Sequence, residues 1–60
     1  MTRKDYVLIA ETIKNQFSYY DELTPEVKAL KELSLRMAYD LGMDNPRFDR
    51  ARFLDACGVN

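Results

Sequence analysis

Apolar residues in the first third of the chain recur at steps of three and four. The positions that share this spacing are Tyr6, Ile9, Ala10, Ile13, Phe17 and Tyr20. Because an α-helix turns once in about 3.6 residues, such positions lie on one helix face. Thr2 and Asp5 stand at the spacing of a capping box, in which each residue satisfies a free backbone N–H at the helix start. The pattern predicts a helix from about residue 3 to about residue 20.

A second helical pattern begins after a short turn at residues 21–23. Thr24 is a favourable cap, and Pro25 suits the first helical position because its missing N–H costs nothing there. The expected inward face of this helix consists of Val27, Leu30, Leu33, Ser34, Met37, Ala38 and Leu41. Gly42 is expected to end the helix in the left-handed conformation, which glycine adopts without steric cost.

A third, shorter helix is expected from about residue 46 to residue 57, with Asp44 or Asn45 as its cap and Gly58 as its end. It carries two apolar faces that lie nearly opposite each other. The first face holds Phe48, Ala51 and Leu54, and the second holds Pro46, Phe53 and Cys57. Since a three-helix monomer covers only one such face well, the second face is expected to lie outside.

These patterns predict an all-α fold, in which residues 1–60 form one domain. Two antiparallel helices would form a hairpin, with the short third helix packed across them. The expected core between the first two helices is Ile9, Ile13, Phe17, Leu30, Leu33, Met37 and Leu41, closed at one end by Phe48 and Leu54.

The small size of the chain favours association with other subunits. A domain of 60 residues buries only about 60% of the surface that its unfolded chain exposes. One cysteine and no histidine exclude an internal disulfide and the usual zinc spacings. We therefore expect a homo-oligomer, with a dimer as first choice. The candidate interface residues lie outside the apolar stripes or on the second face of the third helix: Val7, Leu8, Leu35, Tyr39, Phe53 and Cys57.

The charge pattern is that of an ordinary protein surface. The net charge is −1, with both signs interspersed, which gives no overall field for nucleic acid or for a membrane surface. The longest apolar run covers residues 6–10, far short of the roughly 20 residues of a membrane span. A cytoplasmic location is expected, in agreement with the unpaired cysteine.

No catalytic or metal-binding pattern is present in the sequence. Cys57 is the one thiol, and the chain has no histidine that would act as its base. Asp40, Asp44 and Asp49 flank a turn, but they lack the alternate spacing and the closing glutamate of a calcium loop. The sequence therefore predicts a non-enzymatic protein with no cofactor and no metal.

A minimal helix-turn-helix DNA-binding regulator is the alternative interpretation. Ala38 and Gly42 approximate the small residue and the turn glycine of that motif, and the helix at residues 46–57 would then be the recognition helix. Its candidate DNA contacts are Arg47, Arg50 and Arg52. Three aspartates nearby offset these arginines, whereas DNA binding draws most of its affinity from phosphate neutralisation. Nucleic acid is therefore the less favoured partner.

Both ends of the chain carry a resemblance. The opening Thr2-Arg3-Lys4-Asp5-Tyr6, followed by Ile9-Ala10, and the tail from Asp44 to Gly58 resemble short uncharacterised proteins encoded by bacteriophages and bacteria. Those proteins begin with a similar Lys-Asp-Tyr helix and end near an Asn-Pro-Arg-Phe-Asp-Arg string. The resemblance implies a phage or prophage accessory factor and supplies no active site. The resulting hypothesis is a small accessory protein that self-associates and binds a protein partner.

Overall fold

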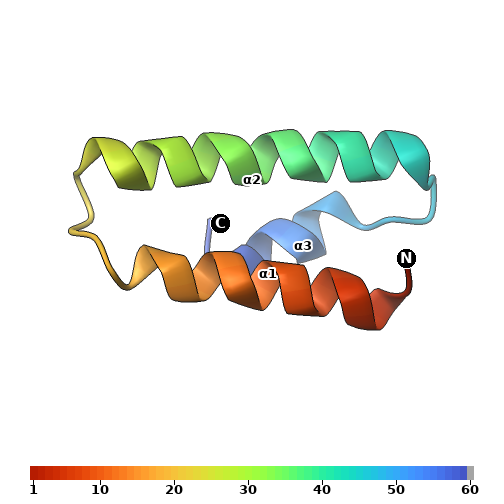
Figure 1. The fold of residues 1–60 in the computed structure, drawn as a ribbon. Coiled ribbons are helices and arrows are strands. Elements are labelled where there is room, and N and C mark those ends of the chain that lie inside the picture. Colours follow the sequence, from red (N-terminus) through yellow and green to blue (C-terminus); the bar gives the residue numbers. More distant parts are fainter. Residues whose placement is uncertain (60) are drawn as a thin grey trace.

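The fold consists of three helices, as expected from the sequence. The computed structural model describes residues 1–59, in which α1 covers Arg3–Phe17, α2 covers Pro25–Asp44 and α3 covers Arg50–Cys57 (Figure 1). No strand is present in this part of the chain, so the all-α class is confirmed.

The start of α1 has the expected cap, but the helix is shorter than expected. The Asp5 carboxylate accepts hydrogen bonds from the backbone N–H of Thr2 at 2.9 Å and from its hydroxyl at 3.2 Å. At the other end the helix stops at Phe17, not near Tyr20, because the next backbone N–H groups bond carbonyls three residues back, as in a tight turn. Tyr20 is consequently exposed and lies outside the core. The sequence pattern, in contrast, predicts Tyr20 on the apolar face of the helix.

The end of α2 differs from the sequence prediction. Thr24 caps the helix by accepting from the Val27 N–H at 3.4 Å, as expected. Gly42, however, does not close the helix, since it has no positive φ and α2 continues to Asp44. The reason is tertiary: the Arg50 guanidinium lies against Gly42, where an added Cβ would come within 2.6 Å of Arg50 Cζ. Glycine at this position permits the Arg50 side chain to approach the backbone of α2 closely, and the backbone at Gly42 stays helical.

The start of α3 also differs from the prediction. Residues 45–48 form a turn in which the Phe48 N–H bonds the Asn45 carbonyl at 2.9 Å, and Asn45 Oδ1 accepts from the Arg47 N–H at 3.1 Å. Because the Asn45 side chain stabilises this turn, it does not cap a helix at Pro46. The cap is Asp49, which accepts from the Arg52 N–H at 3.0 Å. Neither Asp44 nor Asn45 is the cap, but Gly58 ends α3 with a φ of 82°, as expected.

The helix α3 lies between α1 and α2 (Figure 1). It contacts α1 most extensively, and the direct contacts between α1 and α2 are fewer. The central buried cluster consists of Ala10, Ile13, Ala38, Phe53 and Cys57. Since α3 has a long helix on either side, Phe53 and Cys57 are buried and Leu54 is partly buried. The expectation that Phe53 and Cys57 lie on an outer face is therefore wrong.

The core prediction holds in part. Ile13 is buried, while Ile9, Phe17, Met37, Leu41, Phe48 and Leu54 are partly buried against the central cluster. Leu33, by contrast, is 51% exposed. The buried positions of α2 are Val27, Ser34 and Ala38, so Leu33 falls beside this line instead of on it.

Candidate arginine-lined groove

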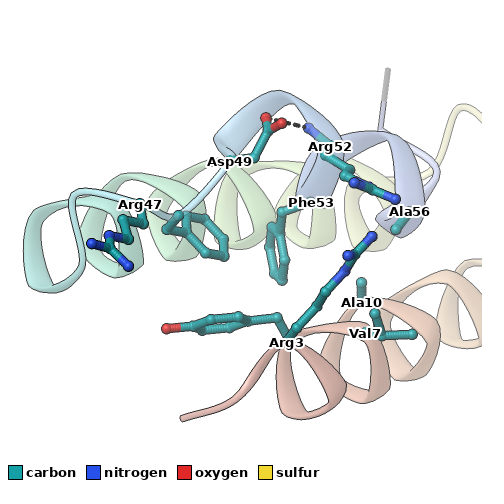
Figure 2. A pocket seen from close by; sticks show the side chains of 10 residues that line it. Arg3, Val7, Ala10, Arg47, Asp49, Arg52, Phe53 and Ala56 are labelled. Carbon is teal, nitrogen blue, oxygen red and sulfur yellow. Dashed lines mark hydrogen bonds between the residues drawn. The ribbon is translucent and has the colours of Figure 1, made fainter.

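A groove lies between the first half of α1 and the segment that leads into α3. Its volume is about 420 Å³. The residues that line it are Arg3, Tyr6, Val7 and Ala10 from α1, Arg47, Phe48 and Asp49 from the connecting segment, and Arg52, Phe53 and Ala56 from α3 (Figure 2). Two regions far apart in the sequence therefore build one concave surface.

Local structure sets the position of each wall. Thr2 caps α1, so that the helix begins at Arg3, and the helical spacing then places Tyr6, Val7 and Ala10 on the groove side. The turn that follows Asn45 places Arg47 at one edge of the groove.

The opposite wall depends on the cap of α3. Asp49 fixes the first turn of α3 through the Arg52 N–H, a bond drawn as a dashed line in Figure 2. Arg52 and Ala56, one turn apart, then face α1 together. The Asp49 carboxylate is thus engaged as a helix cap while it lines the groove.

The floor of the groove is aromatic. The Tyr6 and Phe48 rings meet edge to face with centroids 4.7 Å apart, and the Phe48 and Phe53 rings are tilted with centroids 5.3 Å apart. Both separations are typical of favourable aromatic pairs. Phe53 is only 4% exposed, so this row of rings joins the groove floor to the core.

The rim of the groove carries three arginines. Arg3 and Arg52 reach toward the same end of the groove, and Arg47 lies at the other end (Figure 2). Within residues 1–59 the side-chain ion pair joins Arg36 to Asp40, so Arg3, Arg47 and Arg52 have no carboxylate partner there. The groove is therefore a positively charged site on a chain of net charge −1.

Arg50, the third of the candidate DNA contacts, points elsewhere. Its Nε donates to the Ala38 carbonyl and its Nη2 to the Tyr39 carbonyl, both at 3.2 Å. Its guanidinium also lies 5.3 Å from the centroid of the Tyr39 ring. The structure thus brings Arg47 and Arg52 into one groove and separates Arg50 from them.

The six candidate interface residues do not form a single buried or exposed set. Phe53 and Cys57 belong to the core, and Val7 lines the groove at 45% exposure. Leu8, Leu35 and Tyr39 are more than half exposed, and Tyr39 lies beneath Arg50.

The Cys57 thiol has no exposed surface. Burial raises the pKa of the Cys57 thiol, and hydrogen bonding to Ser34 offsets only part of this effect. A raised pKa keeps the sulfur protonated at neutral pH, whereas the thiolate is the nucleophilic form.

Sequence reasoning missed Arg3 and Tyr6 as parts of a site. Arg3 is one of several surface cations, and Tyr6 fits an ordinary core stripe. Their relation to Arg47 and Arg52 exists only after α3 packs on α1, so no local pattern would have identified it.

Comparisons with known proteins give no relative, since no family model, curated protein or solved structure matches the chain. Within the described residues, no helix has the length and apolar character needed to span a bilayer.

Proposed function

We propose that this chain is a non-enzymatic accessory protein that binds an acidic segment of a protein partner in the arginine-lined groove. The observation that carries the proposal is that Arg3, Arg47 and Arg52 line one groove with an apolar floor, and that none of the three pairs with a carboxylate within residues 1–59. Guanidinium groups match carboxylates in charge and in planar hydrogen-bonding geometry. In a bound segment, an acidic side chain would pair with the arginines of the rim, and a neighbouring apolar side chain would pack on the floor.

A protein segment fits the groove better than nucleic acid does. Arg50 is bound to backbone carbonyls, which leaves two of the three expected phosphate contacts on α3 and its entry segment. The floor rings pack edge to face or tilted against one another, so they do not present the parallel faces on which successive bases stack, whereas an aliphatic side chain needs only apolar contact. The net negative charge of the chain further weakens a phosphate-driven interaction.

The described side chains also support a non-enzymatic role. Asp49, the acidic residue of the groove, acts as the cap of α3. Cys57 is buried in the core and its pKa is raised, so it is poorly suited to act as a nucleophile.

The proposal includes a cytoplasmic location and a phage or bacterial accessory role. The unpaired cysteine supports the first. The resemblance of the two chain ends to short phage proteins supports the second, and the segments that carry this resemblance are those that meet at the groove.

Titration with short capped peptides tests the proposal. A Glu-Glu-Leu peptide should shift the NMR signals of Arg3, Tyr6, Arg47 and Arg52, and the shifts should weaken as salt is added. A Lys-Lys-Leu peptide is the matched control and should leave these signals unchanged. The double variant Arg47→Ala with Arg52→Ala should lose at least about tenfold in affinity.

Arg36→Ala is the control substitution, because Arg36 is exposed on α2 and pairs with Asp40. It should bind the acidic peptide as the wild type does. Equal affinity of the wild type and the Arg47/Arg52 double variant would reject the groove as the binding site. Binding of a duplex oligonucleotide in place of the peptide would favour the DNA-binding alternative.

A further inference from the structure

We infer that the acidic segment received by the groove is the α1–α2 turn of a second copy of this chain. This inference rests on the proposed function and names its partner. The segment consists of Asp21, Glu22 and Leu23, here called the acidic turn. Two copies would place each acidic turn in the groove of the other.

The acidic turn presents an unusual apolar side chain to solvent. Leu23 is 96% exposed, more than any other large apolar residue in the described chain. Asp21 and Glu22 precede it and are exposed. No ion pair within residues 1–59 involves either carboxylate. The turn therefore offers two free acids beside one free apolar side chain.

The backbone of the acidic turn is held in place. The Thr24 hydroxyl donates to the Asp21 carbonyl at 2.8 Å, and the Thr24 N–H donates to the same carbonyl at 3.2 Å. A segment that is already ordered loses less conformational entropy when it binds. The side chains of the turn are thus presented on a fixed support.

The groove is complementary to the acidic turn in charge and in polarity. Arg3, Arg47 and Arg52 would face the two carboxylates, and the aromatic floor would cover Leu23 (Figure 2). Burial of a leucine side chain and pairing of carboxylates with guanidinium groups are both favourable in such a site. The association joins two surfaces whose charged side chains have no ion-pair partner within residues 1–59 of one copy.

The shape of the molecule favours a reciprocal dimer. The body measures 33 × 18 × 15 Å, and the acidic turn lies at the opposite end from the start of α1 and the loop before α3 (Figure 1). Two elongated copies packed antiparallel bring each turn to the groove end of the other copy. Both contacts then form in one twofold dimer, the commonest closed assembly, and each contact strengthens the other.

A charge exchange between the two surfaces tests this arrangement. One variant carries Asp21→Lys and Glu22→Lys, and the other carries Arg47→Glu and Arg52→Glu. In sedimentation equilibrium each variant alone should dimerise at least about tenfold more weakly than the wild type, because like charges meet at both contacts. An equimolar mixture should recover the dimer, because opposite charges meet again.

Two controls separate docking from net charge and from unfolding. The variant with Glu11→Lys and Glu32→Lys makes the same change in net charge as the lysine turn variant, at exposed helix positions, and should dimerise as the wild type does. Circular dichroism should show unchanged helix content for every variant. Leu23→Ser should weaken the dimer with no loss of stability, because Leu23 is exposed in the monomer.

The outcomes distinguish this inference from the proposed function. A wild type that stays monomeric at millimolar concentration, while its groove still binds the acidic peptide, would overturn the dimer and leave the proposed function standing. A dimer that the mixed variants do not restore would also overturn the inference. If the wild type neither dimerises nor binds the acidic peptide, both the inference and the proposed function are rejected.

Discussion

Arg50 occupies the space into which any side chain at position 42 would extend. Its guanidinium lies against Gly42 and donates to the carbonyls of Ala38 and Tyr39. A cation near the carboxyl end of a helix is favourable, because it compensates the negative end of the helix dipole. Glycine within α2 thus permits a contact that fastens the entry of α3 to the end of α2.

This relationship predicts that Gly42→Ala destabilises the fold. Alanine would improve helix propensity by roughly 1 kcal/mol, but it would displace Arg50 from two hydrogen bonds worth about 1–3 kcal/mol in total after allowance for their partial exposure. We expect a net loss of about 1 kcal/mol in urea unfolding. In the Arg50→Ala background the same substitution should become neutral or stabilising, and two additive effects would contradict the proposed contact.

Burial predicts that truncation of two apolar residues, both expected in the core from the sequence, changes the free energy of unfolding by very different amounts. Ile13→Ala removes a buried side chain and should cost about 2–4 kcal/mol. Leu33→Ala should cost less than about 1 kcal/mol, because that side chain is half exposed. Thermal melts of the two variants would measure the difference, and equal shifts would show that the core assignment is wrong.

The cap of α3 offers a third prediction. Asp49→Ala removes the acceptor for the Arg52 N–H and should destabilise the protein by about 1 kcal/mol. Asp49→Asn is the matched control, since asparagine retains a side-chain oxygen and caps helices nearly as well. Chemical denaturation should rank wild type and Asp49→Asn together, above Asp49→Ala. A helix that begins near Pro46 would instead leave Asp49→Ala without effect.

The buried thiol predicts resistance to alkylation and sensitivity to alkali. Because burial raises the pKa of Cys57, the folded thiol remains protonated through the pH range in which an unfolded thiol ionises. Stability is therefore retained at neutral pH and falls as the pH rises above the ordinary thiol pKa, since the unfolded chain then gains by ionising. Iodoacetamide should modify native Cys57 far more slowly than urea-unfolded Cys57.

Cys57→Ala provides the control for that alkaline effect. Its stability should decrease less over the same rise in pH, because no thiol ionises in its unfolded state. Rapid modification of Cys57 in the native protein, at the rate of a free thiol, would contradict its burial.

The capping box at the start of α1 predicts that the stabilisation of the fold by Asp5 depends on pH in the acid range. Hydrogen bonds from the Thr2 backbone and, second, from its hydroxyl lower the pKa of Asp5. The contribution of Asp5 to stability is therefore present above the ordinary carboxyl pKa and is lost as the pH falls through the lowered value. A carbon-detected NMR titration should place the Asp5 midpoint below its ordinary value. Thr2→Ala should reverse only part of the shift, because the backbone donor remains.

Local signals account for the parts of the fold that the sequence predicts correctly. Thr2 with Asp5, Thr24 with Pro25, and Gly58 act on their own neighbours, so their positions mark the helix ends directly. Helical spacing likewise identifies most of the apolar positions that pack inside.

The errors arise where a distant residue decides the structure. Gly42 is the residue type that usually ends a helix. Here it lies within α2, and its lack of a side chain leaves room for the guanidinium of Arg50, eight positions later. The sequence pattern predicts Phe53 and Cys57 on an uncovered face of the third helix. They are buried because α3 packs between α1 and α2. The groove depends on the same packing, because Arg3 meets Arg52 only across the α1–α3 contact.

The central place of α3 has a consequence for the order of folding events. A helix of eight residues is too short to persist alone in water, so α3 must form as it packs on its neighbours. Its main contacts join residues 50–57 to residues 3–17, the most distant segments of the chain. Closing so long a loop comes before most of the core can form, so we expect slower folding than is usual for a helical bundle and no stable hairpin intermediate.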